Sequence, residues 1–124
     1  MKLSHIEDTV MQVADAITAA IGIETEIVDD KLKIIGGTGR YAAKLGTYEE
    51  GGDLDSPYIY AEILRSGIEY VCMDIAEDVM YYSPMEEELA EIACPIKMGT
   101  ETLGIIGLIA FTEEQRSRMK AGRD

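Results

Sequence analysis

The sequence predicts one α+β domain over residues 1–124, with a central, mostly antiparallel sheet of about five strands flanked by helices. A chain of this length suits a single core. Alternating and β-branched runs are joined by short polar turns, which is typical of antiparallel neighbours. Apolar residues at helical spacing near the start of the chain predict a helix that buries one face against that sheet.

The first helix is predicted between Ser4 and Gly22. Ser4 and Glu7 have the spacing of a capping box, and Gly22 is a typical helix stop. The residues between them that recur at helical spacing are Ile6, Val10, Val13, Ile17, Ala20 and Ile21. This pattern gives the helix one apolar face for packing.

A hairpin is predicted next, with strands at 23–28 and 31–35 joined by a tight turn at Asp29 and Asp30. A short helical turn and a polar loop then lead to a helix opened by Ser56 and Pro57 and closed by Gly67. The remaining elements are expected in the order of a strand at 68–75, a brief turn at Ser83 and Pro84, strands at 91–98 and 103–111 joined by Gly99 and Thr100, and a last helix from Thr112.

The predicted last helix has a clear N-cap signal but few apolar residues to bury. Thr112 with Gln115 forms the cap, yet Met119 is its one clear apolar anchor. We therefore expect the chain to be part of a longer protein into which this helix leads.

Composition excludes several classes of partner. With 24 acidic and 11 basic residues the formal net charge is −13, which opposes contact with nucleic acid or anionic lipid. The longest apolar run, Leu103 to Phe111, is too short to span a membrane, and the N-terminus has no signal-peptide pattern. We expect a cytoplasmic protein whose two cysteines are free thiols.

The stretch Lys33 to Gly46 matches a dinucleotide-binding pattern through Gly37, Gly39 and Ala42. That fold also needs a long helix and a second parallel strand, and neither is predicted after Gly46. The glycines can instead form an anion-accepting concavity beside Arg40, or simply a flexible exit from the sheet. We expect Arg40 to be exposed and to contribute little to stability.

Other candidate residues have equally plain structural alternatives. His5 is the only histidine, and Cys72 and Cys94 lack the spacing of a zinc site, so no metal site is predicted. Glutamates and aspartates at 49–55 and 86–91 are expected on solvated faces. Tyrosines such as Tyr41, Tyr58 and Tyr60 suit either a small-molecule pocket or core packing. Gly104 and Gly107 leave gaps in a strand for a neighbour or a ligand.

Two segments carry a family resemblance. "GGTGRY", which ends at Tyr41, and Ala93 to Arg116, "ACPIKMGTETLGIIGLIAFTEEQR", resemble the N-terminal sensory domain of NtrC-type, sigma-N-dependent transcriptional activators of anaerobic bacteria. The "CPI" strand, tight turn and "LGIIGL" strand also resemble the closing hairpin of GAF and PAS sensor domains. The cysteines that such activators carry before this segment are missing here, and only Cys94 matches.

The resemblance implies a GAF/PAS-like domain, without enzymatic activity, that binds a small-molecule effector and regulates an attached ATPase and DNA-binding module. It implies a homodimer and no direct contact of this domain with nucleic acid. The sequence identifies neither the effector nor a cofactor. The residues expected to line the ligand pocket are Thr38, Gly39, Arg40, Tyr41, Tyr60 and Cys94.

Two alternatives remain at this stage. The first is a GAF-type thiol enzyme such as a free-methionine sulfoxide reductase, which needs a reactive and a resolving thiol. The second is a dimerisation module that binds no ligand, which a sealed core beside Arg40 would favour.

Overall fold

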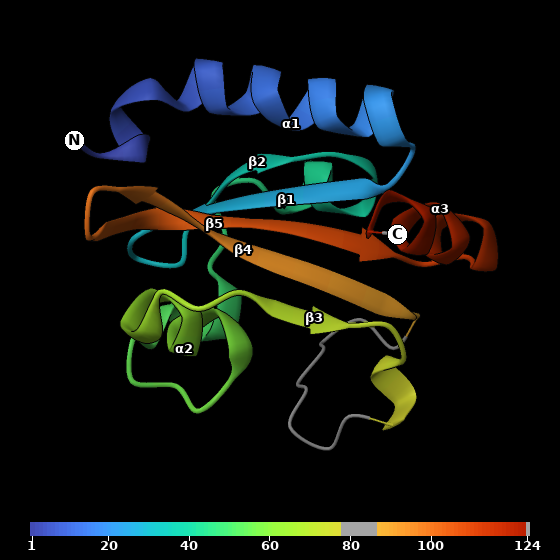
Figure 1. The fold of residues 1–124 in the computed structure, drawn as a ribbon. Coiled ribbons are helices and arrows are strands. Elements are labelled where there is room, and N and C mark those ends of the chain that lie inside the picture. Colours follow the sequence, from blue (N-terminus) through green and yellow to red (C-terminus); the bar gives the residue numbers. More distant parts are fainter. Residues whose placement is uncertain (78–86, 124) are drawn as a thin grey trace.

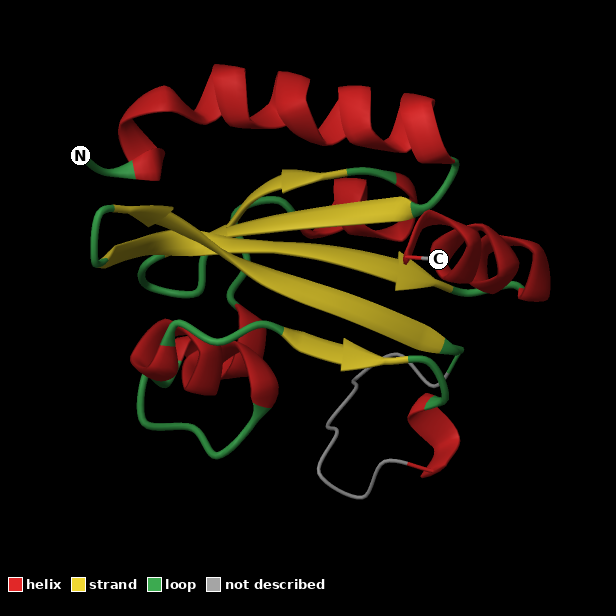
Figure 2. Cartoon of the chain, viewed as in Figure 1, coloured by secondary structure: helices red, strands yellow, loops and turns green. Residues whose placement is uncertain are grey.

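The computed structural model describes residues 1–77 and 87–123 as one sheet with helices packed on both faces (Figures 1 and 2). The helices and strands are, in chain order, α1 Glu7–Ile21, β1 Glu24–Asp29, β2 Ile34–Gly37, α2 Ile59–Ser66, β3 Tyr70–Cys72, β4 Ala90–Met98, β5 Glu101–Ala110 and α3 Glu113–Arg123. Short 3-10 turns precede α1 and fill the connections between β2 and α2 and after β3.

The sheet has five strands in the order β2-β1-β5-β4-β3, and every neighbouring pair is antiparallel. The predicted α+β class and antiparallel sheet are therefore confirmed. The apolar run from Leu103 forms the central strand, as expected of a strand covered on both faces. Because β1 and β2 run antiparallel, the glycine motif at their end is not part of a dinucleotide-binding fold.

The two faces of the sheet have different covers, since successive strand residues point to opposite sides. α1 covers one face, where Val10 and Ala14 pack on Ile27 (Figure 1). α2 covers the opposite face, where Tyr60 and Ile63 join the core. α3 lies at the end of the sheet and buries Met119, the anchor that the sequence predicts.

The first helix and first hairpin differ from the prediction at their turns. Residues Leu3–Ile6 form a 3-10 turn, α1 begins at Glu7, and neither start has a side-chain cap, so the capping box is wrong. The hairpin turn is wider than predicted because Asp29 accepts hydrogen bonds from the backbone N–H groups of Lys31 and Lys33, at 2.8 and 3.0 Å.

The middle of the chain also departs from the local signals. α2 begins at Ile59 rather than at Pro57, and the carboxylate of Glu50 accepts from the N–H groups of Tyr60 and Ala61 at its first turn. The strand expected at 68–75 is reduced to three residues at the sheet edge. The turn predicted at Ser83 and Pro84 lies outside the described residues.

The cap predicted for the last helix is present. The hydroxyl of Thr112 accepts from the N–H of Gln115 at 3.1 Å, and the amide oxygen of Gln115 accepts from the N–H of Phe111 at 2.7 Å. Within the described ranges, no helix has the length and apolar character needed to cross a bilayer.

Candidate functional site

The hydroxyl of Tyr60 lies between two buried carboxylates on the α2 face of the sheet. It donates to Oε1 of Glu26 at 2.9 Å and also contacts Oε2 of Glu91. Glu26 lies on β1 and Glu91 lies on β4. The Tyr60 side chain of α2 therefore contacts carboxylates from two different strands. A phenol has a single proton, and the two carboxylates therefore compete for one donor.

Gly107 is the reason that Tyr60 can reach so deep. It lies on β5 between those two strands, paired with Glu26 on one side and Ala93 on the other. A Cβ at this position would meet the Tyr60 hydroxyl oxygen at 2.1 Å. The gap expected at Gly107 is thus filled by a neighbouring side chain.

A second phenol and carboxylate lie beside the first pair. Tyr41, in the 3-10 turn after β2, is buried and donates to Oε1 of Glu88 at 2.8 Å. Burial, with the negative charge of Glu26, raises the pKa of Tyr41, as does its contact with Glu88. We define the carboxylate cluster as these groups together with one further glutamate: Glu26, Glu49, Glu88 and Glu91 with Tyr41 and Tyr60.

Burial makes the ionised form of Glu26 unfavourable. Burial raises its pKa well above the ordinary value, and the nearby Glu49 and Glu91 carboxyls raise it further, while the bond from Tyr60 lowers it. Among the described residues, Oε2 of Glu26 has no hydrogen-bond partner. Since ionised carboxylates only accept, Glu49 can satisfy Glu26 only when one of the two carries a proton.

An open cleft of about 640 Å³ adjoins the carboxylate cluster through Glu49. Its wall is formed mainly by the loop that leads to α2, and it includes the partly exposed Tyr48 and Tyr58. Asp53 and Glu50 add further carboxylates to the wall. The cleft is therefore aromatic and acidic, with one cation, Lys44, along its lining.

The anion-accepting groups predicted at the glycine turn are used by the protein's own Glu24. Its carboxylate accepts from the N–H of Arg40 at 2.8 Å and from the guanidinium at 2.6 Å. Gly39 has φ +56°, and a Cβ there would lie 2.3 Å from Oε1 of Glu24. The guanidinium carbon of Arg40 also lies 4.1 Å from the ring centre of Phe111, so this arginine is built into the fold.

The structure does not bring all six predicted pocket residues together. Thr38 turns its hydroxyl toward α1, where it accepts from the N–H of Thr25 at 2.9 Å and bonds the hydroxyl of Thr18 at 2.6 Å. Cys94 pairs across the sheet with Ile106 on that same α1 face. The sheet therefore separates Thr38 and Cys94 from Tyr60.

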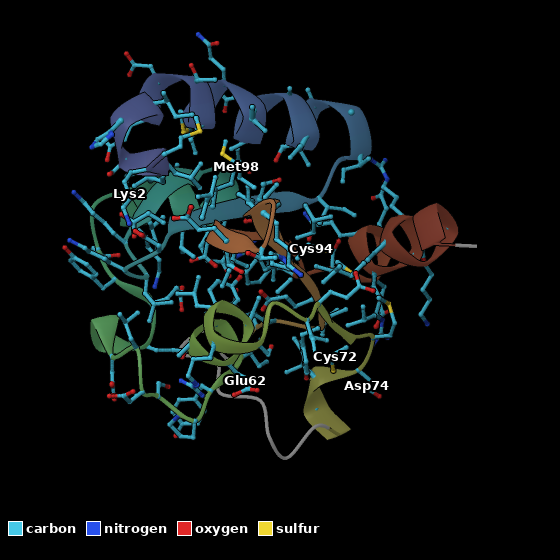
Figure 3. The ribbon with its side chains drawn as sticks, turned by 60° about the vertical axis from the view of Figure 1, so that its left-hand side comes forward. Lys2, Glu62, Cys72, Asp74, Cys94 and Met98 are labelled. Carbon is cyan, nitrogen blue, oxygen red and sulfur yellow. The ribbon has the colours of Figure 1, made fainter. Side chains whose placement is uncertain are left out.

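No disulfide joins Cys72 and Cys94, and they point to opposite faces of the sheet. Cys72 pairs with Glu91 and shares its α2 face, as the predicted alternation with Val71 requires. Cys94 lies closer to α1 in the view of Figure 3, and its thiol is 3.6 Å from a carboxylate oxygen of Glu69. In residues 1–77 and 87–123, no three His, Cys, Asp or Glu side chains are placed to hold a metal ion.

Sequence reasoning missed the glutamates of the carboxylate cluster. Glu88 and Glu91 were expected on a solvated face, yet both are buried. Glu24 and Glu26 alternate with Thr25 and Ile27, a pattern that usually predicts one polar, solvated side. All six residues of β1 are buried because the strand has covers on both faces, which no local pattern reveals.

Comparison with known proteins agrees with this architecture. No family model matches the chain. It is 26% identical over 121 residues to an Escherichia coli K12 protein whose name describes a uric acid sigma-54-dependent transcriptional regulator, UacR. That alignment covers 94% of this chain and 20% of the relative, so the chain spans one fifth of that protein's length. The resemblance to sigma-54-dependent regulators is confirmed.

Solved structures show the same fold. The nlh2 GAF domain of A. aeolicus in an inactive state has a TM-score of 0.67 at 19% identity, covering 94% of this chain and 75% of that one. The GAF domain of an Acinetobacter phosphoenolpyruvate-protein phosphotransferase has a TM-score of 0.67 at 11% identity, with coverages of 93% and 75%. A type II free methionine-R-sulfoxide reductase from Thermoplasma acidophilum also has a TM-score of 0.67 at 11% identity, with coverages of 98% and 89%. The chain has the GAF fold, as the sequence predicts.

Proposed function

We propose that this GAF-fold chain is the effector-sensing domain of a sigma-54-dependent transcriptional regulator, the class also called sigma-N-dependent. The observation that carries the proposal is the alignment of 94% of the chain with one fifth of such a regulator. The remaining four fifths of that relative leave room for ATPase and DNA-binding modules. The domain itself senses and contacts no DNA, in keeping with its charge of −13.

The effector binds on the α2 face, at the carboxylate cluster and the cleft beside it. Tyr60 and Tyr41 are the members of the predicted pocket that reach this face. Arg40 and Gly39 form a rim around Glu24, which lies on this same face of β1. These placements support a site that extends from the cleft at Glu49 to the floor formed by β1 and β4.

Glu24 connects that rim to the last helix. Besides the two bonds from Arg40, its Oε2 accepts from the side-chain amide of Gln115 at 3.3 Å. Gln115 lies in the first turn of α3 and also accepts from the N–H of Phe111. An effector that shifts Arg40 or Glu24 therefore changes the start of α3, with a coupling of about 1–3 kcal/mol typical of linked sites.

A chimera tests the proposed function. The matching fifth of the Escherichia coli relative is replaced by this chain, and transcription from a sigma-54-dependent promoter is measured with and without cell extract fractions. Ligand-dependent output that disappears when the chain is deleted supports a sensor. A folded, soluble chimera with the same output under every condition contradicts it.

The reductase alternative has one specific observation behind it, the similarity to a free methionine-R-sulfoxide reductase fold. The thiols of Cys72 and Cys94 lie on opposite faces of the sheet, which opposes their acting as a reactive and resolving pair. We expect no consumption of free methionine-R-sulfoxide by the chain with a thiol reductant. Turnover that is lost in Cys72→Ser or Cys94→Ser would replace the sensor proposal.

A further inference from the structure

We propose that the ligand of the α2 face is a small organic cation, an ammonium, amidinium or guanidinium compound, whose N–H groups donate to Glu26 and Glu49. The inference rests on the proposed function, because it names the chemical class of the effector for that same site. It is carried by an unpartnered buried oxygen, a shortage of donors, and the lining of the adjoining cleft.

The buried Glu26 carboxyl has too few hydrogen-bond donors around it. Glu26 is only 2% exposed, and its Oε2 has no hydrogen-bond partner in the part of the chain that the structure describes. Its other oxygen shares the single proton of Tyr60 with Glu91. Leaving a buried acceptor unsatisfied costs free energy, and leaving a buried charge unpaired costs more. The raised pKa of Glu26 favours a proton on this carboxyl in the free protein, and a ligand with several N–H groups replaces that proton with donors of its own.

The charges of Glu26 and Glu49 also favour a cationic ligand. The ion pairs found within residues 1–77 and 87–123 involve neither Glu26 nor Glu49. The nearby Glu49 carboxyl also raises the pKa of Glu26, which disfavours the ionised form of Glu26. A cation between them reverses this penalty, since each carboxylate then faces an opposite charge.

The cleft supplies a place for the rest of the ligand. Glu49 belongs to both regions, because it lines the cleft of about 640 Å³ and also faces Glu26. Tyr48 and Tyr58 expose aromatic rings on the same wall, 53% and 38% exposed. Aromatic faces attract cations and cover flat apolar groups, and the cleft is large enough for a small molecule.

An anionic ligand fits this site less well. The E. coli relative is named for uric acid, which is an anion at neutral pH. Here such an anion would enter a cleft lined by Glu49, Glu50 and Asp53, whose negative charges repel it. The carboxylate cluster and the cleft beside it therefore favour a cation over urate and other anions.

The test uses three probes of one shape and different charge. Benzamidine is a cation with N–H donors, benzamide is a neutral donor, and benzoate is an anion. Each is titrated to about 10 mM into the 124-residue chain at low salt, a range that detects Kd values near 1 mM. Backbone amide shifts around Tyr60, Gly107 and Glu49 report binding at this site.

The proposal expects benzamidine to shift these amides and benzoate to leave them unchanged. Glu26→Gln and Glu49→Gln should each weaken benzamidine at least about tenfold, because each removes a charge-assisted acceptor. Glu62→Gln is the matched control, since Glu62 is an exposed carboxylate on α2 (Figure 3) and does not line the cleft. It should leave the Kd within about twofold.

Several outcomes overturn the inference. If benzoate or benzamide shifts the same amides and benzamidine does not, the site binds a ligand of another class, and the proposed sensor function stands. If no probe shifts them, or if benzamidine binds equally to wild type, Glu26→Gln and Glu49→Gln, the cation assignment is wrong. Circular dichroism of each variant shows whether it folds. If Glu26→Gln does not fold, Glu49→Gln, at the half-buried cleft wall, still tests the cation assignment.

Discussion

The guanidinium of Arg40 lies over the ring of Phe111, with 4.1 Å between the guanidinium carbon and the ring centre. Arg40 belongs to the glycine turn, and Phe111 directly follows the central strand, just before α3. Tyr41 also contacts this ring, at 6.1 Å between ring centres. The turn expected to be a flexible lip is thus packed against the exit of the chain into its last helix.

Replacing Arg40 by alanine should lower the free energy of unfolding by about 1 kcal/mol, because Glu24 loses a charge-assisted hydrogen bond while its side chain stays largely buried. Sequence reasoning expected no effect on folding. Urea unfolding of Arg40→Ala measures the change, and Arg118→Ala, which removes an exposed ion pair within α3, serves as the control. Equal stability of the two variants would mean that the Arg40 contacts contribute nothing.

The carboxylate cluster should make stability depend on pH through Glu26. Its folded pKa is raised above the ordinary value of 4.5 by burial, by Glu49 and by Glu91. Between 4.5 and that raised pKa the folded state binds more protons than the unfolded state, so stability falls as pH rises. Below this window the group contributes its full stability, and above it the contribution is lost.

Glu26→Gln removes this titration and provides the measurement. The free energy of unfolding of the variant minus that of wild type should rise with pH across the window, by about 1.4 kcal/mol per pH unit. Urea unfolding at a series of pH values gives both curves. A difference that stays constant with pH would show that Glu26 titrates alike in the folded and unfolded states.

Gly107→Ala should lower the free energy of unfolding by about 1–3 kcal/mol, since the new Cβ would lie 2.1 Å from the Tyr60 hydroxyl oxygen. Gly122→Ala is the matched control, because a Cβ there meets nothing within 4 Å. Adding Tyr60→Phe removes the clashing oxygen, and the double variant should lose less than the sum of the two single changes. Strict additivity would mean that Tyr60 does not occupy the gap.

Thr38→Val should lower the free energy of unfolding by about 1–3 kcal/mol, because the N–H of Thr25 loses its buried acceptor. Thr38→Ser keeps the hydroxyl and should retain most of the stability. Thermal or urea unfolding gives the comparison. Since Thr38 faces α1, neither variant should alter amide shifts around Tyr60, and a change there would return Thr38 to the ligand site.

Elements with strong local signals were predictable. The periodicity of α1, the glycine that ends it at Gly22 and the cap of α3 at Thr112 all act within a few residues of the chain. The start of α2 was not predictable, because its first N–H groups donate to Glu50, which lies ten residues before Tyr60. Long-range partners of this kind leave no trace in local spacing.

By itself the sequence determined the α+β class and the antiparallel pairing of the strands, because strand alternation and turn chemistry are local properties. Two of its segments also carried the GAF resemblance. The tertiary structure decided which polar residues are buried together. Glu26 and Glu91 resemble surface residues in sequence. Only the packing of α2 over β1 and β4 removes them from water and places both beside the Tyr60 hydroxyl. Burial depends on what lies above a strand, and that is set by the packing of the whole chain.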